Sequence, residues 1–302
     1  MTKIRTLAPV WALALALTLL FALGGACMAS SSKETPAKPA VLLVSFGSSM
    51  PEGQAAIAAT LDSVKQAFPG TEVRVAYTSR IIMRKLAKQG QIIDDPLVAL
   101  AKLHADGFTH VAILSTHVIP GEEYEDLGAI VRCFDQLGRD EGKTGFRGIA
   151  LSRPLLWSDE DFDRLAAALN RTYGKRLQDG AVVFMGHGTP HPANGAYSRL
   201  QTVLNRISPK LLVGTVEGTP SFDDLVARLK TLGVRRVTLV PAMLVAGDHA
   251  HNDMAGPEED SWKSQLTKMG FRVDTVLQGF GQNPEVRALM LEHLKEAAKK
   301  AF

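Results

Sequence analysis

Two continuous apolar runs, each ending in a glycine-containing turn, place the strongest constraint on how this chain can fold. One run covers residues 41–46 and is followed by Gly47; the other covers residues 181–184 and leads into a Gly-His-Gly sequence at 186–188. Apolar runs without alternation are typical of strands buried on both faces of a parallel sheet. Segments with helical spacing separate strand-like segments along the chain. The sequence therefore predicts an α/β fold with parallel sheets covered by helices.

The expected elements alternate from residue 41 to residue 300. We expect strands at 41–46, 72–78, 110–115, 146–151, 181–184, 211–216, 236–245 and 271–276. We expect helices at 52–68, 81–88, 96–105, 124–137, 159–173, 192–207, 221–232, 258–269 and 284–300. Residues 246–254 are expected to form a loop.

A faint internal repeat divides the chain into two halves. The run and turn at 44–48 resemble those at 184–189, and residues 115–126 resemble residues 242–253. We therefore predict two pseudo-symmetric lobes, an N-terminal lobe at 41–157 and a C-terminal lobe at 158–302, with a cleft between them. The closing helix can pack back on the N-terminal lobe.

Residues 1–29 have the pattern of a secretory signal peptide. Two basic residues precede an apolar stretch at 11–23, and small residues follow it. Cleavage would place the protein in the periplasm, with residues 30–40 as a flexible polar leader. An uncleaved membrane anchor and a lipoprotein attached through Cys27 are the alternatives. If cleavage follows Ala29, Cys133 is the only cysteine left, so no internal disulfide forms; we expect Cys133 to be buried on a helix.

The composition favours an ordinary soluble domain over a nucleic-acid-binding protein. The chain has 302 residues, of which 46% are hydrophobic and 22% are charged. Its formal net charge of +3 is too small to indicate a nucleic-acid partner. The chemistry must therefore come from particular side chains.

Three side chains that bind metals well follow strands of the second half. They are His187, Glu217 and His249, which are 30 and 32 residues apart in the sequence. Successive parallel strands place such positions side by side at the carboxyl edge of a sheet, where ligands bind. Two imidazoles and a carboxylate are a common ligand set for a divalent transition metal. The alternative is three unrelated polar residues that cap helices or bind the backbone.

Neighbouring polar residues are expected to support this site. His251 is expected at the surface or beside the ligands, and His191 at the rim. Asp248 and Asp253 can orient the imidazole rings, as carboxylates often do around metal sites. Three other histidines are expected to be structural or solvated: His104, His110 and His293.

The first half lacks the ligand set, which predicts a division of labour. Phe46 occupies the position that matches His187, and Glu123 the position that matches His249. Ser45, Ser48 and Ser49 can donate hydrogen bonds to an anionic ligand at the strand-to-helix turn, although ordinary turn hydrogen bonding explains them equally well. The opposite lip of the cleft is expected to carry His117, Glu122 and Glu123.

Four motifs together resemble those of a known family. They lie at residues 42–48, 185–189, 216–220 and 245–254, and the similarity extends from residue 41 to about residue 300. The chain resembles class II tetrapyrrole chelatases, specifically the anaerobic sirohydrochlorin cobaltochelatases of the CbiK type. The apolar N-terminus resembles that of the periplasmic variant.

The resemblance implies a function and a site. It implies insertion of Co²⁺, or of Fe²⁺ in some members, into sirohydrochlorin held between the lobes, with His187, Glu217 and His249 as metal ligands. Ser45, Phe46 and Ser48 would line the substrate cleft. It implies a place in cobalamin biosynthesis; we predict no organic cofactor and expect a homo-oligomer.

Metal insertion also suits these residue types. Two pyrrole protons must leave the ring, and neutral imidazoles can hold a metal and accept protons near pH 7. The rival hypothesis is an exported carrier or storage protein for a metal or a tetrapyrrole, which would not turn over.

Overall fold

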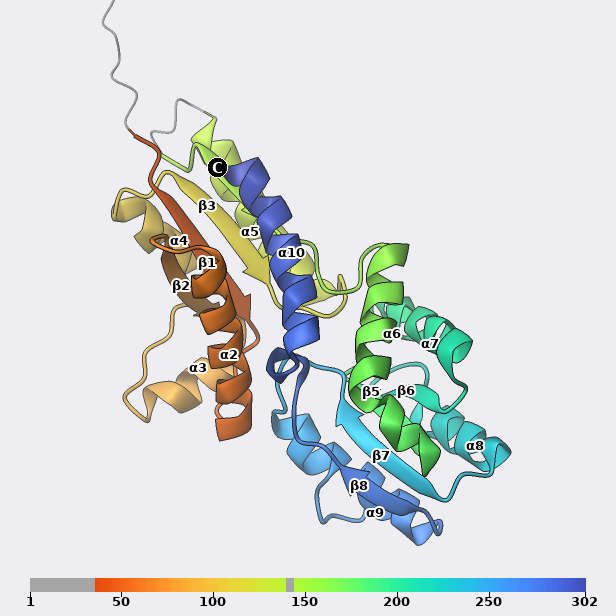
Figure 1. Ribbon diagram of the computed structural model, residues 1–302. Helices are drawn as coiled ribbons and strands as arrows, with labels where there is room; N and C mark the ends of the chain where they lie inside the picture. Colours follow the sequence, from red (N-terminus) through yellow and green to blue (C-terminus); the bar gives the residue numbers. More distant parts are fainter. Residues whose placement is uncertain (1–35, 140–143) are drawn as a thin grey trace, which may run out of the picture. The chain divides into compact units, whose positions relative to one another are not determined.

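Two four-stranded parallel sheets organise the chain (Figure 1). The computed structural model describes residues 36–139 and 144–302. The first sheet has the strand order β2-β1-β3-β4 and the second has the order β6-β5-β7-β8. The strands are β1 (Pro39–Ser45), β2 (Glu72–Tyr77), β3 (His110–Ser115), β4 (Gly148–Leu151), β5 (Ala181–Gly186), β6 (Leu211–Thr215), β7 (Arg236–Pro241) and β8 (Arg272–Thr275). The predicted α/β fold with two parallel-sheet lobes is confirmed.

Helices connect the strands and cover the sheets. They are α2 (Pro51–Ala67), α3 (Arg80–Ala87), α4 (Pro96–Ala105), α5 (Glu122–Gly138), α6 (Asp159–Tyr173), α7 (Gly195–Ile207), α8 (Phe222–Leu232), α9 (Trp262–Lys268) and α10 (Pro284–Ala301). Short 3₁₀ segments are η1 (Gly174–Gln178), η2 (Pro192–Asn194) and η4 (Phe280–Gln282). In the described parts of the chain, no helix is both long enough and apolar enough to cross a membrane.

Matching glycines end the central strand of each sheet. Gly47 follows β1 with φ of 95° and Gly188 follows β5 with φ of 81°. A Cβ at Gly47 would lie 2.5 Å from the Tyr77 ring, and one at Gly188 would lie 2.6 Å from the main chain of Glu217. Because a side chain is disfavoured at this φ and has no room, both turns require glycine. The internal repeat is therefore visible in the backbone.

Some element boundaries differ from those expected. The strand expected at 146–151 begins only at Gly148, and the helix expected at 192–207 is divided into η2 and α7. The helix expected at 258–269 is the shorter α9, because the Ser261 hydroxyl accepts the Ser264 N–H and caps it there. The loop expected at 246–254 contains a five-residue π-helix, η3 (Ala250–Met254). Such segments are frequent at functional sites.

A shared hydrophobic core joins the lobes. One buried cluster includes Leu43 of β1, Phe184 of β5 and Leu294 of α10, and the outer faces of the two sheets each pack on a cluster of their own. Although α10 follows the second sheet in the sequence, it packs against β3 and β4 of the first. The proposed boundary at 157/158 stays a prediction.

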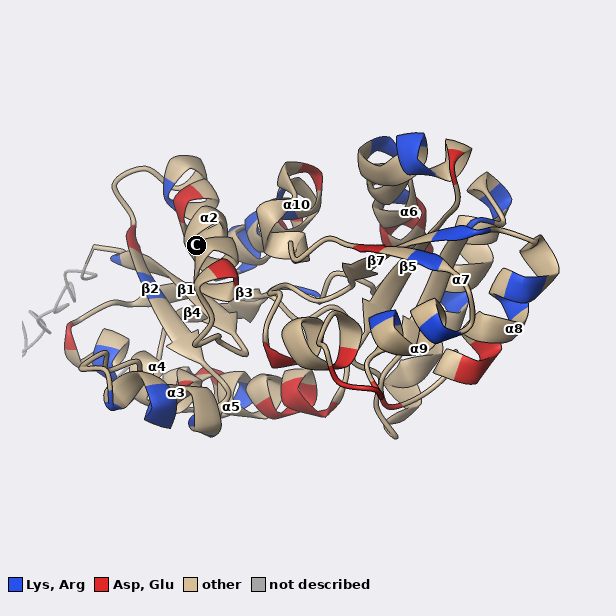
Figure 2. Cartoon of the chain, turned by 90° about the horizontal axis from the view of Figure 1, so that it is seen from below, with Lys and Arg blue, Asp and Glu red and all other residues tan. Residues whose placement is uncertain are grey.

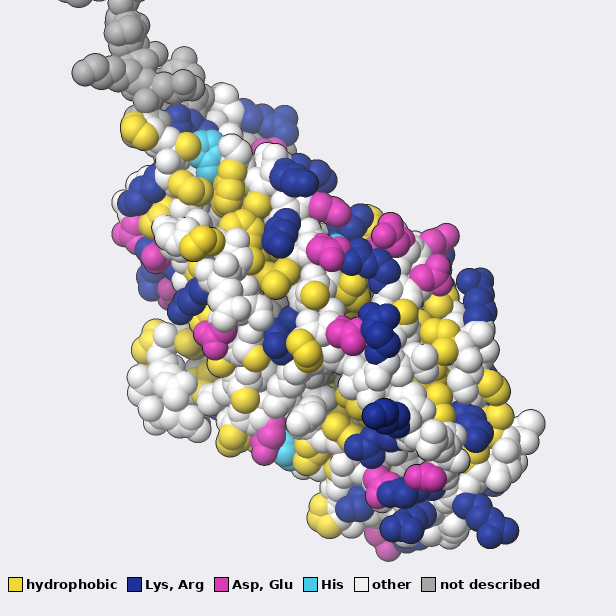
Figure 3. Space-filling model, viewed as in Figure 1, with side chains coloured by type: hydrophobic (Ala, Val, Ile, Leu, Met, Phe, Trp, Pro, Cys, Tyr) yellow, Lys and Arg dark blue, Asp and Glu magenta, His cyan; other side chains and the backbone are white. Residues whose placement is uncertain are grey.

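Three ion pairs connect α10 to α6 and to Arg153, which lies between β4 and α6. Figure 3 shows cationic and anionic side chains intermingled on this face of the molecule. The pairs are Arg153–Glu296, Arg164–Glu292 and Arg171–Glu285. Exposed pairs of this kind contribute roughly 0–1 kcal/mol each. The apolar contacts beneath them therefore hold the two helices together.

One buried ion pair also connects α6 to α10. Nε2 of His293 lies 2.9 Å from Oδ1 of Asp161, and both side chains are at most 4% exposed. Burial raises the pKa of Asp161, but hydrogen bonds from Ser158 and His293 outweigh it, so the net pKa is lowered. His293 is therefore structural.

The other two histidines expected to be structural or solvated also make local contacts. His104 packs edge-on against Phe146, and His110 contacts the Thr109 hydroxyl.

Cys133 is exposed on α5, so the expectation that it would be buried is wrong. The reason is the helix face: Val131 and Phe134 supply the buried positions on either side of it. The predicted signal peptide, Cys27 and most of the leader lie outside the described residues.

Replacing His293 tests the buried pair. We expect His293→Ala to lower the free energy of unfolding by about 3 kcal/mol, because the buried Asp161 carboxylate keeps Ser158 but loses its imidazole partner and the missing ring leaves a cavity. The lowered pKa of Asp161 means that this stabilisation exists above the ordinary aspartate pKa and is lost as the pH falls. Urea unfolding at pH 7 measures the change. The exposed Lys295→Ala on the same helix is the control, and an equal effect in both variants would contradict the expectation.

Candidate metal and tetrapyrrole site

His187 lies where β5 leaves the sheet. The strand is fully buried as far as Gly186, and the half-buried His187 follows it. Nδ1 of His187 lies 2.7 Å from the carbonyl oxygen of Gly188. Because a carbonyl only accepts, Nδ1 must carry the proton in this contact. The neutral ring therefore keeps the lone pair on Nε2.

His249 has the same protonation pattern for a different reason. It immediately precedes the π-helix η3, and its Nδ1 contacts the carboxylate of Asp253 one helical turn later. An ionised carboxylate only accepts hydrogen bonds, so Nδ1 again carries the proton. A carboxylate behind an imidazole commonly orients a metal-binding histidine. Asp248, the other predicted orienting residue, is exposed.

The two imidazoles meet although 61 positions separate them in the sequence. Their ring centroids are 4.6 Å apart and the ring planes are inclined by 87°. Both rings hold their Nδ1 in a hydrogen bond to an acceptor, which leaves both Nε2 atoms able to bind a divalent ion. Neutral imidazole nitrogens of this kind suit cobalt, iron, zinc and nickel.

Glu217 lies beside His187 through its main chain. Its N–H donates to the carbonyl oxygen of His187 at 2.7 Å, and its side chain is exposed. Across residues 36–139 and 144–302, no group of three or more His, Cys, Asp or Glu side chains is arranged to hold a metal ion. The structure thus brings together two of the predicted ligands and the backbone of the third. The set His187, Glu217 and His249 stays a prediction.

Two histidines of the second lobe reach glutamates of the first. Nε2 of His251 lies 3.5 Å from Glu52 at the start of α2, and Nε2 of His191 lies 3.4 Å from Glu125 on α5. Ala193 donates its N–H to Nδ1 of His191, so the Nε2 that faces Glu125 carries the proton. These contacts connect the segments around the imidazole pair to the N-terminal lobe.

The matching turn of the N-terminal lobe presents an aromatic ring. Phe46 is 47% exposed, whereas Ser45 and Ser48 are at most 2% exposed. The Ser45 hydroxyl accepts the Gly47 N–H, and the Ser48 hydroxyl accepts the Met50 N–H. Both hydroxyls therefore serve the turn itself, which was the alternative interpretation of these serines. Their contact with a ligand stays a prediction.

His117, a predicted site residue of the N-terminal lobe, lies in the segment between β3 and α5. Its Nδ1 lies 2.8 Å from the Ser115 hydroxyl, and its Nε2 lies 3.3 Å from Glu123. Its ring also packs edge-on against Tyr124, which in turn lies against the exposed Trp157. Burial raises the pKa of Tyr124, so this phenol stays neutral at physiological pH. Tyr124 and Trp157 were not predicted.

Tyr197 is a further residue that the sequence analysis missed. It lies on α7, is 3% exposed, and the main-chain N–H groups of His187 and Gly188 act to lower the pKa of its hydroxyl. Burial raises its pKa to about 12, although these N–H groups oppose the shift. A Cβ at Gly186 would lie 2.3 Å from the Tyr197 ring. The phenol therefore supports the turn that holds His187; its only sequence signal is an aromatic residue on the inner face of a helix.

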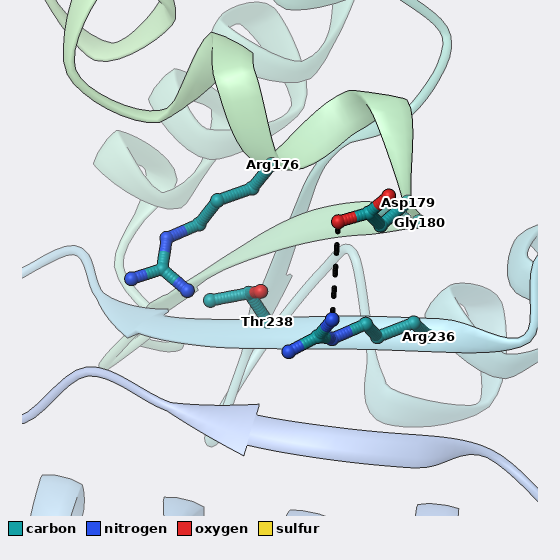
Figure 4. A pocket seen from close by; sticks show the side chains of 6 residues that line it. Arg176, Asp179, Gly180, Arg236 and Thr238 are labelled. Carbon is teal, nitrogen blue, oxygen red and sulfur yellow. Dashed lines mark ion pairs between the residues drawn. The ribbon is translucent and has the colours of Figure 1, made fainter.

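A separate small cavity lies at the other edge of the second sheet. It has a volume of about 70 Å³ and is lined by residues that include Ala181, Arg236 and Thr238 at the amino ends of β5 and β7 (Figure 4). Arg236 forms an ion pair with Asp179. It also donates a hydrogen bond to Asp274, which lowers the pKa of the Asp274 carboxyl. This cavity is remote from the carboxyl edge, where ligands of parallel sheets bind.

Relatives of known function identify the class of protein. The chain has two parallel-sheet lobes and a histidine pair at the carboxyl edge of the second sheet. The model of the family described as "Cobalt chelatase (CbiK)" matches residues 39–299. The chain belongs to the cobalt chelatase (CbiK) family, which confirms the resemblance found in its motifs.

Individual relatives cover nearly the whole domain. The chain is 40% identical over 261 residues to sirohydrochlorin cobaltochelatase CbiKC of Nitratidesulfovibrio vulgaris, covering 86% of this chain and 90% of that protein. It is 40% identical over 266 residues to the sirohydrochlorin cobaltochelatase of Salmonella typhimurium, covering 87% and 98%. The fold is similar to that of SirB from Bacillus subtilis with Fe³⁺, with a TM-score of 0.60, 17% identity, and coverage of 86% and 96%.

Asp253 is expected to strengthen metal binding through His249. We predict that Asp253→Ala raises the dissociation constant for Co²⁺ by about 10- to 100-fold, because the His249 ring loses the carboxylate that orients it. Isothermal titration calorimetry with CoCl₂ measures the change. Asp248→Ala removes the same charge one residue before His249 and should change the constant less than about threefold. An equal loss of Co²⁺ affinity in both variants would contradict this prediction and indicate a general effect of the removed charge.

The buried phenol predicts a pH-dependent stability. A pKa raised from about 10 to about 12 means that the folded state retains the proton longer than the unfolded chain, so stability falls as the pH rises between these values. The stability advantage of the wild type over Tyr197→Phe should shrink by about 2 kcal/mol between pH 9 and pH 12. Urea unfolding at several pH values measures it, and a constant difference would refute the assignment.

Proposed function

We propose that this protein inserts Co²⁺ into sirohydrochlorin. The supporting observation is the imidazole pair, with ring centroids 4.6 Å apart, in a chain 40% identical to proteins named as sirohydrochlorin cobaltochelatases over about nine-tenths of their length. The cobalt ion is a substrate that leaves with the product.

The reaction requires a metal donor and a proton acceptor at one place. Sirohydrochlorin and Co²⁺ yield the cobalt complex and two protons, which come from the pyrrole nitrogens. In this proposal, Nε2 of His187 and Nε2 of His249 hold the incoming ion. As the ring nitrogens displace these ligands, an imidazole nitrogen released from the ion takes up a pyrrole proton. An exposed Glu217 beside His187 completes the ligand set and passes protons to solvent.

A small number of protein ligands suits transfer rather than storage. A site with two imidazoles and one carboxylate leaves coordination positions open to ring nitrogens, as catalytic metal sites do. The same nitrogen and oxygen donors accept Fe²⁺ as well as Co²⁺, because affinity alone does not separate neighbouring divalent metals. We therefore propose Fe²⁺ as an alternative substrate metal.

The proposal places the enzyme outside the cytoplasm, based on the pattern of residues 1–29. Cell fractionation followed by mass spectrometry of the mature N-terminus tests this part independently. Recovery of the intact chain in the cytoplasmic fraction would refute it without affecting the chelatase proposal.

Turnover is the test of the enzyme proposal. With sirohydrochlorin and Co²⁺ in excess, we expect each protein chain to produce many metallated rings. The absorbance of the cobalt complex measures how many are formed. His187→Ala should lower kcat/KM by about 100-fold or more, in the range of a lost general base or ligand. His104→Ala, a histidine on α4, is the control and should leave the rate unchanged. One metallated ring per chain and no more would instead indicate a carrier.

A further inference from the structure

Helix α3 is an unpaired basic element. Arg80, Arg84, Lys85 and Lys88 are all exposed, and no acidic residue occurs between Ser79 and Gln91. Within residues 36–139 and 144–302, none of these four cations forms an ion pair with a carboxylate. The buried Leu86 holds the opposite face of the helix against the core.

The pseudo-symmetry places the start of α3 at the strand edge. In the second lobe, the N–H of Glu217 donates to the carbonyl oxygen of His187. In the first lobe, the N–H of Ser79 donates to the carbonyl oxygen of Phe46 at 3.2 Å. Since Phe46 matches His187, Ser79 matches Glu217, and Arg80 follows at once. The first lobe therefore carries cations where the second carries a predicted metal ligand.

Two other helices that follow strands, α5 and α8, begin with acidic residues instead. Figure 2 colours parts of the α3 ribbon blue for Lys and Arg, and parts of the α5 ribbon red for Asp and Glu. Exposed carboxylates near the strand ends include Glu122, Glu123, Glu125, Glu217 and Asp248. A ligand that carries many negative charges is thus attracted to this edge mainly at α3.

Three of the cations form a single stripe. Arg80, Arg84 and Lys88 are four residues apart, so they lie on one side of the helix. Nε of Arg84 donates to the carbonyl oxygen of Arg80, which leaves its terminal nitrogens available. Like charges at this spacing repel one another and destabilise a helix slightly. An anionic ligand would remove that repulsion.

We propose that this stripe binds the carboxylates at the periphery of the tetrapyrrole. The inference rests on the proposed function, because sirohydrochlorin carries acetate and propionate groups around its ring. Guanidinium groups bind carboxylates in paired hydrogen bonds, and the exposed Phe46 beside the start of α3 offers a surface for the flat ring. The stripe then anchors the macrocycle from the N-terminal lobe, while the imidazole pair supplies the metal from the other.

A charge-matched pair of variants tests the proposal. The first combines Arg80→Gln, Arg84→Gln and Lys88→Gln; the control combines Lys295→Gln, Lys299→Gln and Lys300→Gln on α10, which removes the same charge elsewhere. We expect the first to raise KM for sirohydrochlorin about tenfold or more with kcat within about twofold, and the control to change neither. The KM of the wild type should rise with salt, and that of the first variant should rise less.

Binding without metal separates this inference from the enzyme proposal. Metal-free sirohydrochlorin is titrated into each protein, and quenching of tryptophan fluorescence reports the dissociation constant. A loss of affinity of about tenfold in the α3 variant alone supports the stripe even if the wild type does not turn over. A combined Arg80→Lys, Arg84→Lys and Lys88→Arg variant keeps all three charges, so it should bind more tightly than the glutamine variant, although the paired hydrogen bonds of Arg80 and Arg84 are lost. Equal affinity in the α3 variant, the control and the wild type would overturn the inference.

Discussion

The main-chain hydrogen bond from Glu217 to His187 is the constraint on which the site depends. It forms because β5 and β6 are parallel neighbours whose carboxyl ends leave the sheet together. The close approach requires Gly188, where a side chain would strike the Glu217 main chain. His249 follows β7, the third strand of this edge, and lies directly before η3. Ordinary sheet geometry thus gathers residues that lie far apart in the sequence.

The same backbone frame serves two purposes in the two lobes. Gly47 and Gly188 both have a positive φ, of 95° and 81°, and the strand orders are equivalent. The side chains differ: His187 in one lobe corresponds to the apolar Phe46 in the other, and the acidic Glu217 corresponds to Ser79 and the basic helix behind it. In the function we propose, the protein must hold both a metal cation and a polyanionic ring, which require opposite charges. We propose that the different side chains on the two similar backbones provide them.

Particular residues show how far sequence reasoning reached. The lobes, the strands and the proximity of His187 to His249 were predicted, because apolar runs and their spacing indicate which strands lie in a parallel sheet. Cys133 was expected to be buried and is exposed. Helical periodicity predicts the buried face of a helix only to within about one residue, and Cys133 lies beside that face. The π-helix that carries Asp253 toward His249 was expected to be a loop. Tyr197 was missed, because its packing against the turn at Gly186 exists only once α7 folds back on β5.

By itself, the sequence determined the class of fold, the family and the order of the functional residues along the strands, since these follow from local hydrophobic patterns and motif spacing. Only the tertiary structure decided which imidazole nitrogens are free, because that depends on a carbonyl and a carboxylate placed by separate segments. It also decided that α3 begins beside Phe46. Such contacts arise from the packing of distant elements, and no local pattern of residues specifies them.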